Sequence, residues 1–247
     1  MSSTRRIAVI LGVGPGLSTS IAKSLSTTHS LVLLSRSLPD SLPKLNLPST
    51  IPKDNILALS SDGSTSSLQK AFEDLKKHWP EGRVDVGIYN VNQKLNLNGF
   101  LDKKEEDLRR GLESGVVGAW NLSQSLLPLF LSNSPDPTTG AKGVLLFTGA
   151  TKSLKAGGKF SSLAPGMFAR RALSQSLARE FGPQGVHVGH VIIDGIIDTQ
   201  AVKGMMGENG NKRLKPDDIA QTYLSLVNQP RSAWTQELDL RPDNEQW

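Results

Sequence analysis

Short apolar runs alternate along the chain with longer segments in which apolar residues recur every three or four positions. The runs are typical of buried strands and cover 6–11, 30–34, 56–59, 84–89, 144–147, 186–193 and 237–240. The longer segments predict helices from Leu17 onward, over 67–78, over 104–130 with a break near Gly111 or Gly115, over 168–181 and over 216–227. Strands that alternate with helices indicate a parallel sheet covered on both faces. The pattern therefore predicts an α/β fold, a Rossmann-like doubly wound sheet of about seven strands.

Two segments show neither period. Residues 38–55 contain Pro39, Pro43, Pro48 and Pro52, which exclude a regular helix and predict a long loop. Residues 201–214 are rich in Gly and Met, and Met205 and Met206 could form an adaptable lid over an apolar substrate. The chain shows no linker and no internal repeat, so we expect residues 1–247 to form a single domain.

Composition narrows the class of protein. Cysteine is absent, which excludes disulfides and thiolate metal sites, and we expect no metal. The net charge of +5 comes from scattered Lys and Arg, and 5% of the residues are aromatic, which argues against nucleic-acid binding. No apolar run approaches the roughly 18 residues that span a bilayer, and the first residues lack a signal-peptide cleavage site. We expect a cytoplasmic protein without membrane contact.

A glycine-rich turn, Gly12-Val13-Gly14-Pro15-Gly16, follows the first strand and precedes the first helix. A dinucleotide needs a tight turn there, with backbone N–H groups free to reach its pyrophosphate. The second strand ends at Ser35 and Arg36, where the ribose of the adenosine is normally recognised. An acidic residue would bind a 2′-hydroxyl, whereas Arg suits a 2′-phosphate. These residues favour NADP(H) over NAD(H).

These and later segments resemble the short-chain dehydrogenase/reductase family over nearly the whole chain. The matching segments are Gly12-x-x-x-Gly16-Leu17, Asp62, Tyr89-Asn90-Val91-Asn92, the helix segment 172–180, Gly185-Val186-His187-Val188, Asp194-Gly195-Ile196-Ile197-Asp198-Thr199 and Pro216-Asp217-Asp218-Ile219-Ala220. The resemblance implies an NADP(H) site formed by Gly12, Gly14, Gly16, Leu17, Ser35, Arg36, Asp62, Asn90, Gly195, Ile197 and Thr199. It also implies a homodimer or homotetramer. Trp120, Leu122 and Leu126 could form that contact, although a monomer could equally bury them.

The positions of the family's catalytic residues differ in this chain. The family's Asn aligns with Gly115, its Ser with Gly149 or Ala150, its Tyr with Leu163 and its Lys with Met167. In the family the Tyr acts as the acid and the Lys lowers its pKa, and such help contributes roughly 10²–10⁴ in rate. Leu163 and Met167 supply neither function. Ordinary ketone reduction at neutral pH is therefore expected to be slow.

One hypothesis is a non-standard, biosynthetic reductase acting on a bulky apolar or cationic acceptor, such as an imine or iminium ion, which needs no proton relay. Asp194 and Asp198 would then hold the cation, and Thr148 is the nearest hydroxyl to the Ser position. The Pro165-Gly166 pair is similar to fungal reductase and cyclase members of the family that act in indole alkaloid biosynthesis. Those enzymes carry an acid before the pair, where this chain has Ala164.

Two alternatives stay open. The cavity could preorganise a substrate for a non-redox cyclisation or isomerisation, or the chain could be an NADP-binding pseudoenzyme or partner subunit. Arg170 and Arg171 lie one turn beyond Met167, and we expect them at the surface or in a subunit contact.

Overall fold

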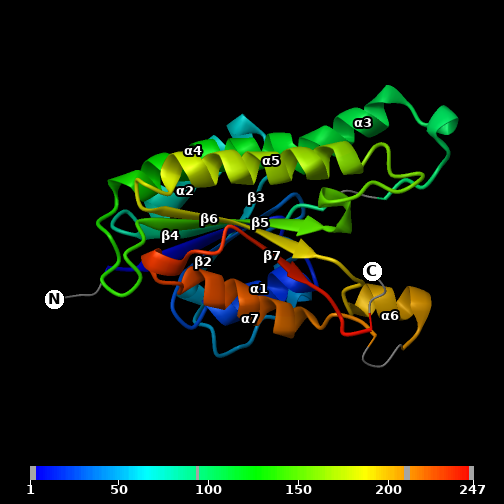
Figure 1. The fold of residues 1–247 in the computed structure, drawn as a ribbon. Coiled ribbons are helices and arrows are strands. Elements are labelled where there is room, and N and C mark those ends of the chain that lie inside the picture. The colour runs from blue at the N-terminus through cyan, green and yellow to red at the C-terminus, as the bar shows by residue number, and fades with distance from the viewer. Residues whose placement is uncertain (1–3, 93–94, 209–211, 245–247) are drawn as a thin grey trace.

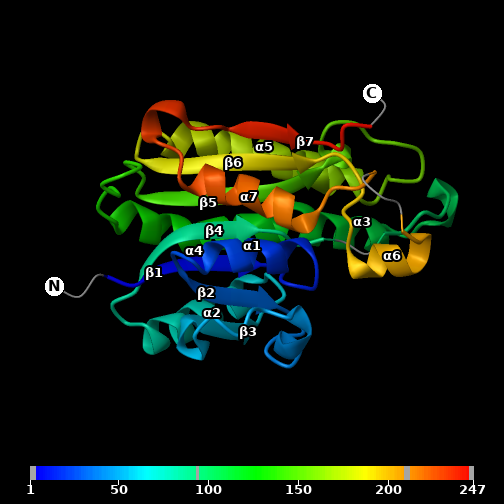
Figure 2. The ribbon, with the colours of Figure 1, turned by 90° about the horizontal axis from the view of Figure 1, so that it is seen from below.

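Seven parallel strands form one sheet at the centre of the computed structural model, which describes residues 4–92, 95–208 and 212–244. The strands are β1 (Arg6–Leu11), β2 (Ser30–Ser35), β3 (Ile56–Ser60), β4 (Arg83–Tyr89), β5 (Gly143–Ala150), β6 (Val186–Ile193) and β7 (Glu237–Leu240). Their order in the sheet is β3-β2-β1-β4-β5-β6-β7, as Figure 2 shows. This arrangement confirms the predicted doubly wound α/β fold.

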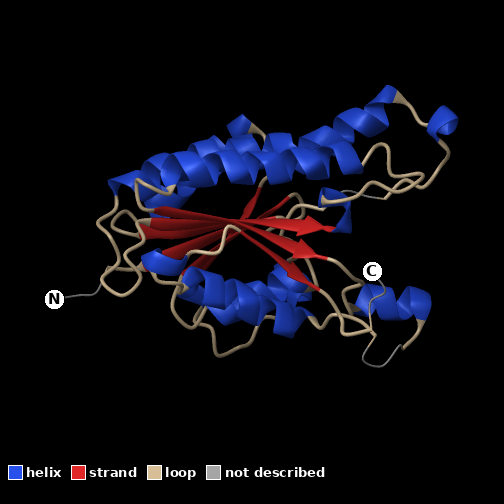
Figure 3. Cartoon of the chain, viewed as in Figure 1, coloured by secondary structure: helices blue, strands red, loops and turns tan. Residues whose placement is uncertain are grey.

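Helices cover both faces of the sheet, which explains why the strands are continuous apolar runs. Helices α1 (Leu17–Leu25) and α7 (Pro216–Val227) cover one face. Helices α2 (Thr65–His78), α4 (Gly118–Ser132) and α5 (Ala164–Phe181) cover the other (Figures 1 and 3). Each face has its own apolar core. Leu122 and Leu126 are fully buried in the second core, so they serve no subunit contact, whereas Trp120 is 52% exposed.

The long helix before β5 is interrupted, as its glycines predict. Helix α3 (Glu105–Leu112) leads into a π-helical turn over Glu113–Val117, and α4 continues from it. Residues 38–55 form the predicted loop, with two short 3-10 turns. A short helix, α6 (Gln200–Met206), occupies part of the segment without a period, and the Thr199 side chain caps its first turn.

Helix α5 begins at Ala164, four residues before the predicted start. Pro165 lies in its first turn, where the missing N–H has no helical partner to lose. Leu163, Met167 and Arg170 are therefore set by one helix end beside the sheet. Among the described residues, no helix is long and apolar enough to cross a membrane.

The chain passes from β1 to β2 on one side and returns through β3 to β4 on the other. Parallel sheets bind ligands beyond the carboxyl ends of their strands at such a reversal. Gly12, Asn90 and Thr148 all lie at this edge, at the ends of β1, β4 and β5.

Candidate cofactor and active site

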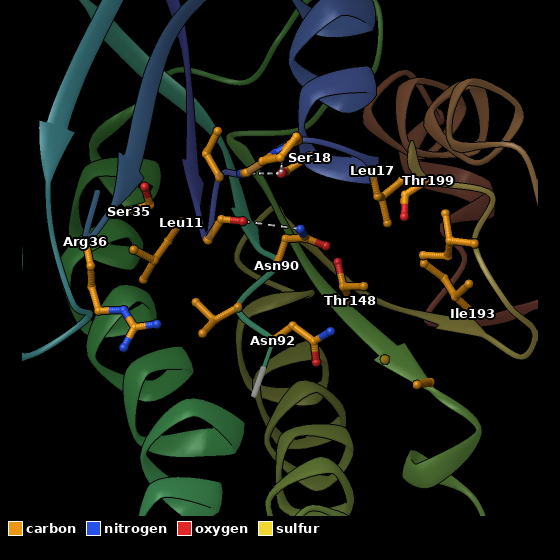
Figure 4. A pocket seen from close by; sticks show the side chains of 18 of the residues that line it. Leu11, Leu17, Ser18, Ser35, Arg36, Asn90, Asn92, Thr148, Ile193 and Thr199 are labelled. Carbon is orange, nitrogen blue, oxygen red and sulfur yellow. Dashed lines mark hydrogen bonds between the residues drawn. The ribbon is translucent and has the colours of Figure 1, made fainter. Parts of the chain in front are cut away.

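A cavity of about 950 Å³ opens beyond the carboxyl ends of the strands (Figure 4). Of the predicted cofactor-binding residues, all but Gly16 line it: Gly12, Gly14, Leu17, Ser35, Arg36, Asp62, Asn90, Gly195, Ile197 and Thr199. A second cavity of about 850 Å³ shares Arg36, Asp62, Val91 and Asn92 with the first. The structure thus brings together residues that are separated by almost 190 positions in the sequence.

The glycine turn is held between two other segments. Gly12 has a φ of 95°, and a Cβ there would lie 2.6 Å from the backbone of Asn90. Gly16 has a φ of 126°, and a Cβ there would lie 2.9 Å from Cγ2 of Thr199. Gly14 faces open space, and the first N–H groups of α1 have no capping side chain. Such a turn leaves room and donors for an anionic group.

Arg36 and Asp62 lie at the other end of the cavity. The exposed Arg36 guanidinium has no carboxylate within ion-pair distance in the described part of the chain, so it is free to meet a ligand. Hydrogen bonds from the side chain and the backbone N–H of Ser64 and from the Ser67 hydroxyl lower the pKa of Asp62 to about 2. Asp62 is therefore ionised at neutral pH and can accept a further hydrogen bond.

Thr148 lines the cavity at the end of β5, and its Oγ1 lies 2.6 Å from the hydroxyl of Tyr223 on α7. Tyr223 is fully buried, so the bond fixes the Thr148 hydroxyl from the α7 face of the sheet. The phenol is the stronger acid of the two hydroxyls, which favours Tyr223 as the donor and leaves the Thr148 proton for a bound group.

The chain contains two tyrosines, and both are buried. Burial raises the pKa of Tyr89 to about 12 and also raises that of Tyr223. Because the raised values apply to the folded state, their stabilising contribution is complete below pH 10 and is lost as the pH rises through 12. We expect an absorbance titration at 295 nm to show no phenolate near pH 10 and to rise together with loss of the near-UV dichroism signal. Ionisation of either phenol in the folded protein at pH 10 would contradict this.

The position that the resemblance assigns to the family's Asn is a helix contact. A Cβ on Gly115 would lie 2.5 Å from Cα of Gly166, and a Cβ on Gly166 would lie 2.3 Å from the carbonyl oxygen of Gly111. The π-helical turn and α5 therefore touch through their backbones. Met167 is buried and lines the cavity, whereas Leu163 is half-buried and is not among the lining residues.

At Gly149, one of the two positions assigned to the family's Ser, neighbouring side chains fill the space that a side chain would need. A Cβ on Gly149 would lie 2.3 Å from Nε2 of His190 and 2.9 Å from Oγ of Ser153. His190 is 1% exposed, and its Nδ1 lies 2.9 Å from a carboxylate oxygen of Glu237. His190 is thus a buried, hydrogen-bonded histidine, in agreement with its mid-strand place, and its ring leaves no room for a side chain at 149.

The expected carboxylates do not line the cavity. Asp194 accepts a hydrogen bond from Thr151 and forms an ion pair with Arg241 at 3.1 Å. Asp198 forms ion pairs with Lys203 at 3.3 Å and Arg213 at 3.4 Å. The lining residues of this segment are the alternate ones, Ile193, Gly195, Ile197 and Thr199. In extended chain successive side chains point to opposite sides, so 194 and 198 point away.

Arg170 is the charged lining residue that the sequence interpretation missed. It is 2% exposed, so the expectation of a surface or subunit contact is wrong. Its guanidinium donates to the backbone carbonyls of Gly115, Thr148, Val91 and Ser114. Arg171 is likewise bonded within the chain, to both carboxylate oxygens of Glu237 at 2.7 Å. The one available signal was helical spacing, because Arg170 follows Met167 by three residues and Gly166 by four.

Comparison with known proteins agrees with this architecture. A family model described as short chain dehydrogenase matches residues 6–209. An uncharacterized oxidoreductase of Staphylococcus aureus is 24% identical over 241 residues, which cover 97% of this chain and 98% of that protein. A short-chain dehydrogenase structure from Rhodopseudomonas palustris is 26% identical, with a TM-score of 0.72 over 96% of this chain and 98% of the other.

Two further structures are similar in fold. An alcohol dehydrogenase from Thermococcus sibiricus, complexed with 5-hydroxy-NADP, is 22% identical with a TM-score of 0.79 over 98% of each chain. An NADPH-bound short chain oxidoreductase from Pseudomonas aeruginosa with an atypical catalytic center is 16% identical, with a TM-score of 0.81 over 98% of this chain and 97% of the other. Since the family model matches well over half of the sequence, the protein belongs to the short-chain dehydrogenase family of oxidoreductases.

Proposed function

We propose that the protein is an NADP(H)-dependent oxidoreductase that transfers hydride without a Tyr–Lys proton relay. The observation that carries this proposal is the 950 Å³ cavity, which is continuous from Arg36 past the glycine turn to Thr148 and Met167. The extent of the cavity and the residues that line it suit a dinucleotide together with a small substrate. In two structures of similar fold, 5-hydroxy-NADP is bound to the alcohol dehydrogenase from Thermococcus sibiricus and NADPH to the short chain oxidoreductase from Pseudomonas aeruginosa.

The residues present fit such a cofactor. The open space at Gly14 and the uncapped start of α1 would hold the pyrophosphate. Arg36 would bind a 2′-phosphate, and Asp62 would accept a hydrogen bond from the adenine. Gly195, Ile197 and Thr199 would lie beside the nicotinamide, which supplies the hydride when bound. Met167, Ile193 and Ile197 give this end an apolar wall.

Arg36→Asp is expected to weaken NADPH binding about 10–100-fold, because a charge-assisted bond to the 2′-phosphate is replaced by repulsion. NADH binding should change little or improve, because Asp suits a 2′-hydroxyl. Fluorescence titration of both cofactors against the purified variant measures the ratio of the two affinities. Arg179→Asp is the matched control, since Arg179 is exposed on α5 and is not a lining residue. An unchanged NADPH to NADH ratio in Arg36→Asp would show that Arg36 does not recognise the phosphate.

The substrate end of the cavity favours a carbonyl compound, or the corresponding alcohol, over an iminium ion. Asp194 and Asp198, which would have held a cation, point away from the cavity. The charged side chain beside Thr148 and Met167 is the cation Arg170, which repels an iminium ion. We propose that hydride addition to the carbonyl carbon leaves an alkoxide that accepts a hydrogen bond from the Thr148 hydroxyl, which Tyr223 holds in place, and that takes its proton from water in the open cavity.

Thr148→Val is expected to lower kcat about 10–100-fold while the NADPH affinity stays the same, because one hydrogen bond to the reacting oxygen is lost. Thr148→Ser keeps the hydroxyl and should retain most of the activity. The assay follows NADPH absorbance at 340 nm against a panel of ketones, aldehydes and cyclic iminium salts. Product that forms while NADPH stays constant would favour a non-redox cyclase or isomerase. NADPH binding without turnover of any compound would favour a binding or partner subunit.

A further inference from the structure

The guanidinium of Arg170 lies where three segments meet at the inner end of the cavity. Nε donates to Gly115 O at 2.6 Å, and Nη1 donates to Thr148 O at 2.6 Å. Nη2 donates to Val91 O at 3.1 Å and to Ser114 O at 2.7 Å. The ring of Tyr89 lies against it, with its centroid 4.7 Å from Cζ. These contacts fix the charge between the ends of β4 and β5 and the π-helical turn.

This positive charge has no counterion in the described part of the chain. No carboxylate there lies within ion-pair distance of Arg170: Glu237 is bonded to Arg171 and His190, and Glu113 interacts with the neighbouring Tyr89. Buried charges are ordinarily paired, because a low dielectric makes an isolated ion costly. The four carbonyl dipoles and the Tyr89 ring compensate the guanidinium in part. A negatively charged group arriving through the cavity would complete the pairing.

The donor count leads to the same conclusion. A guanidinium has five N–H groups, and the four backbone carbonyls use four of them. The fifth is on Nη1. The Tyr89 side chain also hydrogen-bonds to the guanidinium, so a ligand would join or displace it there. Because Arg170 lines the cavity next to Thr148, a ligand in the cavity can supply an acceptor for the fifth N–H.

We propose, on the basis of the proposed function, that Arg170 binds an anionic oxygen of the substrate through this fifth N–H. The substrate class is therefore an oxo compound, or its alcohol, that either carries an acidic group or develops negative charge on the reacting oxygen. Arg170 thereby supplies a cation close to Met167, the position at which the family resemblance places a Lys. It approaches from the next turn of α5.

Three probes of equal size test the charge preference: benzoate, benzamide and benzylammonium, each titrated by calorimetry into the protein saturated with NADP⁺. Benzoate is expected to bind about tenfold more tightly than benzamide, as for a charge-assisted bond, and benzylammonium least tightly. Any other ranking, including no binding by all three, overturns the proposal. Turnover of a 2-oxo acid and of its neutral methyl ester with NADPH then distinguishes a recognised carboxylate from a recognised reacting oxygen.

Variants of Arg170 and Arg171 test which residue causes the preference for benzoate over benzamide. Arg170→Met should remove the difference between benzoate and benzamide, and Arg170→Lys should keep part of it. Arg171→Met is the matched control, because its guanidinium bonds Glu237 and is not among the lining groups, and it should keep the full preference. If Arg170→Met does not fold, the ranking by the unaltered protein and by Arg170→Lys decides.

Two outcomes separate this inference from the proposed function. Failure of NADP⁺ or NADPH to bind the unaltered protein refutes the proposed function. A different result would refute this inference alone: the unaltered protein binds NADP⁺ but shows no preference for benzoate, and Arg170→Lys binds NADP⁺ tenfold more weakly. The fifth N–H would then be assigned to the cofactor.

Discussion

Arg170→Met is expected to lower the free energy of unfolding by about 3–5 kcal/mol, because four backbone carbonyls lose hydrogen bonds to a buried, charged donor that contribute about 1.5–3 kcal/mol each, while removal of the unpaired charge recovers part of that loss. Met fills much of the same volume, so the loss comes from hydrogen bonds rather than from a cavity. The carbonyls of Gly115, Thr148 and Val91 lose this side-chain donor at the wall of the cavity. The Ser114 carbonyl keeps one donor, the Tyr89 hydroxyl at 2.7 Å.

Urea unfolding followed by circular dichroism measures the change. Arg171→Met is again the control: its ion pair with Glu237 is partly exposed, with 32% and 22% of the two side chains accessible. Fully exposed pairs contribute at most about 1 kcal/mol. This bidentate pair is partly buried and contributes more, but its loss leaves Glu237 bonded to His190, so this variant should lose less than Arg170→Met. If both variants lose the same free energy of unfolding, the carbonyl contacts of Arg170 contribute little to stability. The midpoint of NADP⁺ binding to Arg170→Met should then also equal that of the unaltered protein.

The place of the proposed cofactor-binding residues around the cavity could be predicted from the sequence because its determinants are local. The turn from Gly12 to Gly16 lies directly between a strand and a helix, and Arg36 directly follows the next strand. Such residues reach the carboxyl edge of the sheet in any doubly wound fold. The position of these residues at the cavity therefore follows from the order of the strands, once the alternation of strands and helices is recognised.

The catalytic half could not be predicted in the same way, because distant residues decide it. Arg170 and Arg171 are adjacent on α5 but have different partners. Arg170 bonds to backbone carbonyls at the ends of β4 and β5 and in the π-helical turn, whereas Arg171 bonds to Glu237 of β7. Asp194 and Asp198 were expected near the nicotinamide from their segment as a whole. The alternation of side chains along it turns both of them toward basic partners instead.

The start of α5 is a second feature that the sequence pattern did not predict. The apolar period becomes clear from Phe168, but the first helical turn depends on capping and on a Pro that is compatible with it, and both leave weak signals in a sequence. The consequence is functional, since the earlier start places Gly166 against Gly115. The two helices approach closely because neither residue has a side chain.

Gly115→Asn, which introduces the residue that the family resemblance places there, is expected to destabilise the protein by about 3 kcal/mol or more rather than restore activity. The new Cβ would lie 2.5 Å from Cα of Gly166, so the π-helical turn and α5 would have to separate. That separation also draws the Gly115 carbonyl away from Nε of Arg170. At roughly 2–4 °C per kcal/mol for a chain of this size, the melting temperature should fall by about 6 °C or more.

Gly158→Asn is the matched control, because a Cβ at Gly158 meets nothing within 4 Å and the residue is exposed. Its melting temperature should stay within about 1 °C of that of the unaltered protein, as is usual for surface substitutions. If Gly115→Asn melts like the control and reduces ketones faster than the unaltered protein, the site keeps room for the family's relay. The contact between Gly115 and Gly166 would then not be what excludes it. Loss of stability in Gly115→Asn alone would mean that close helix packing and the Arg170 network now occupy the volume that an Asn side chain would require.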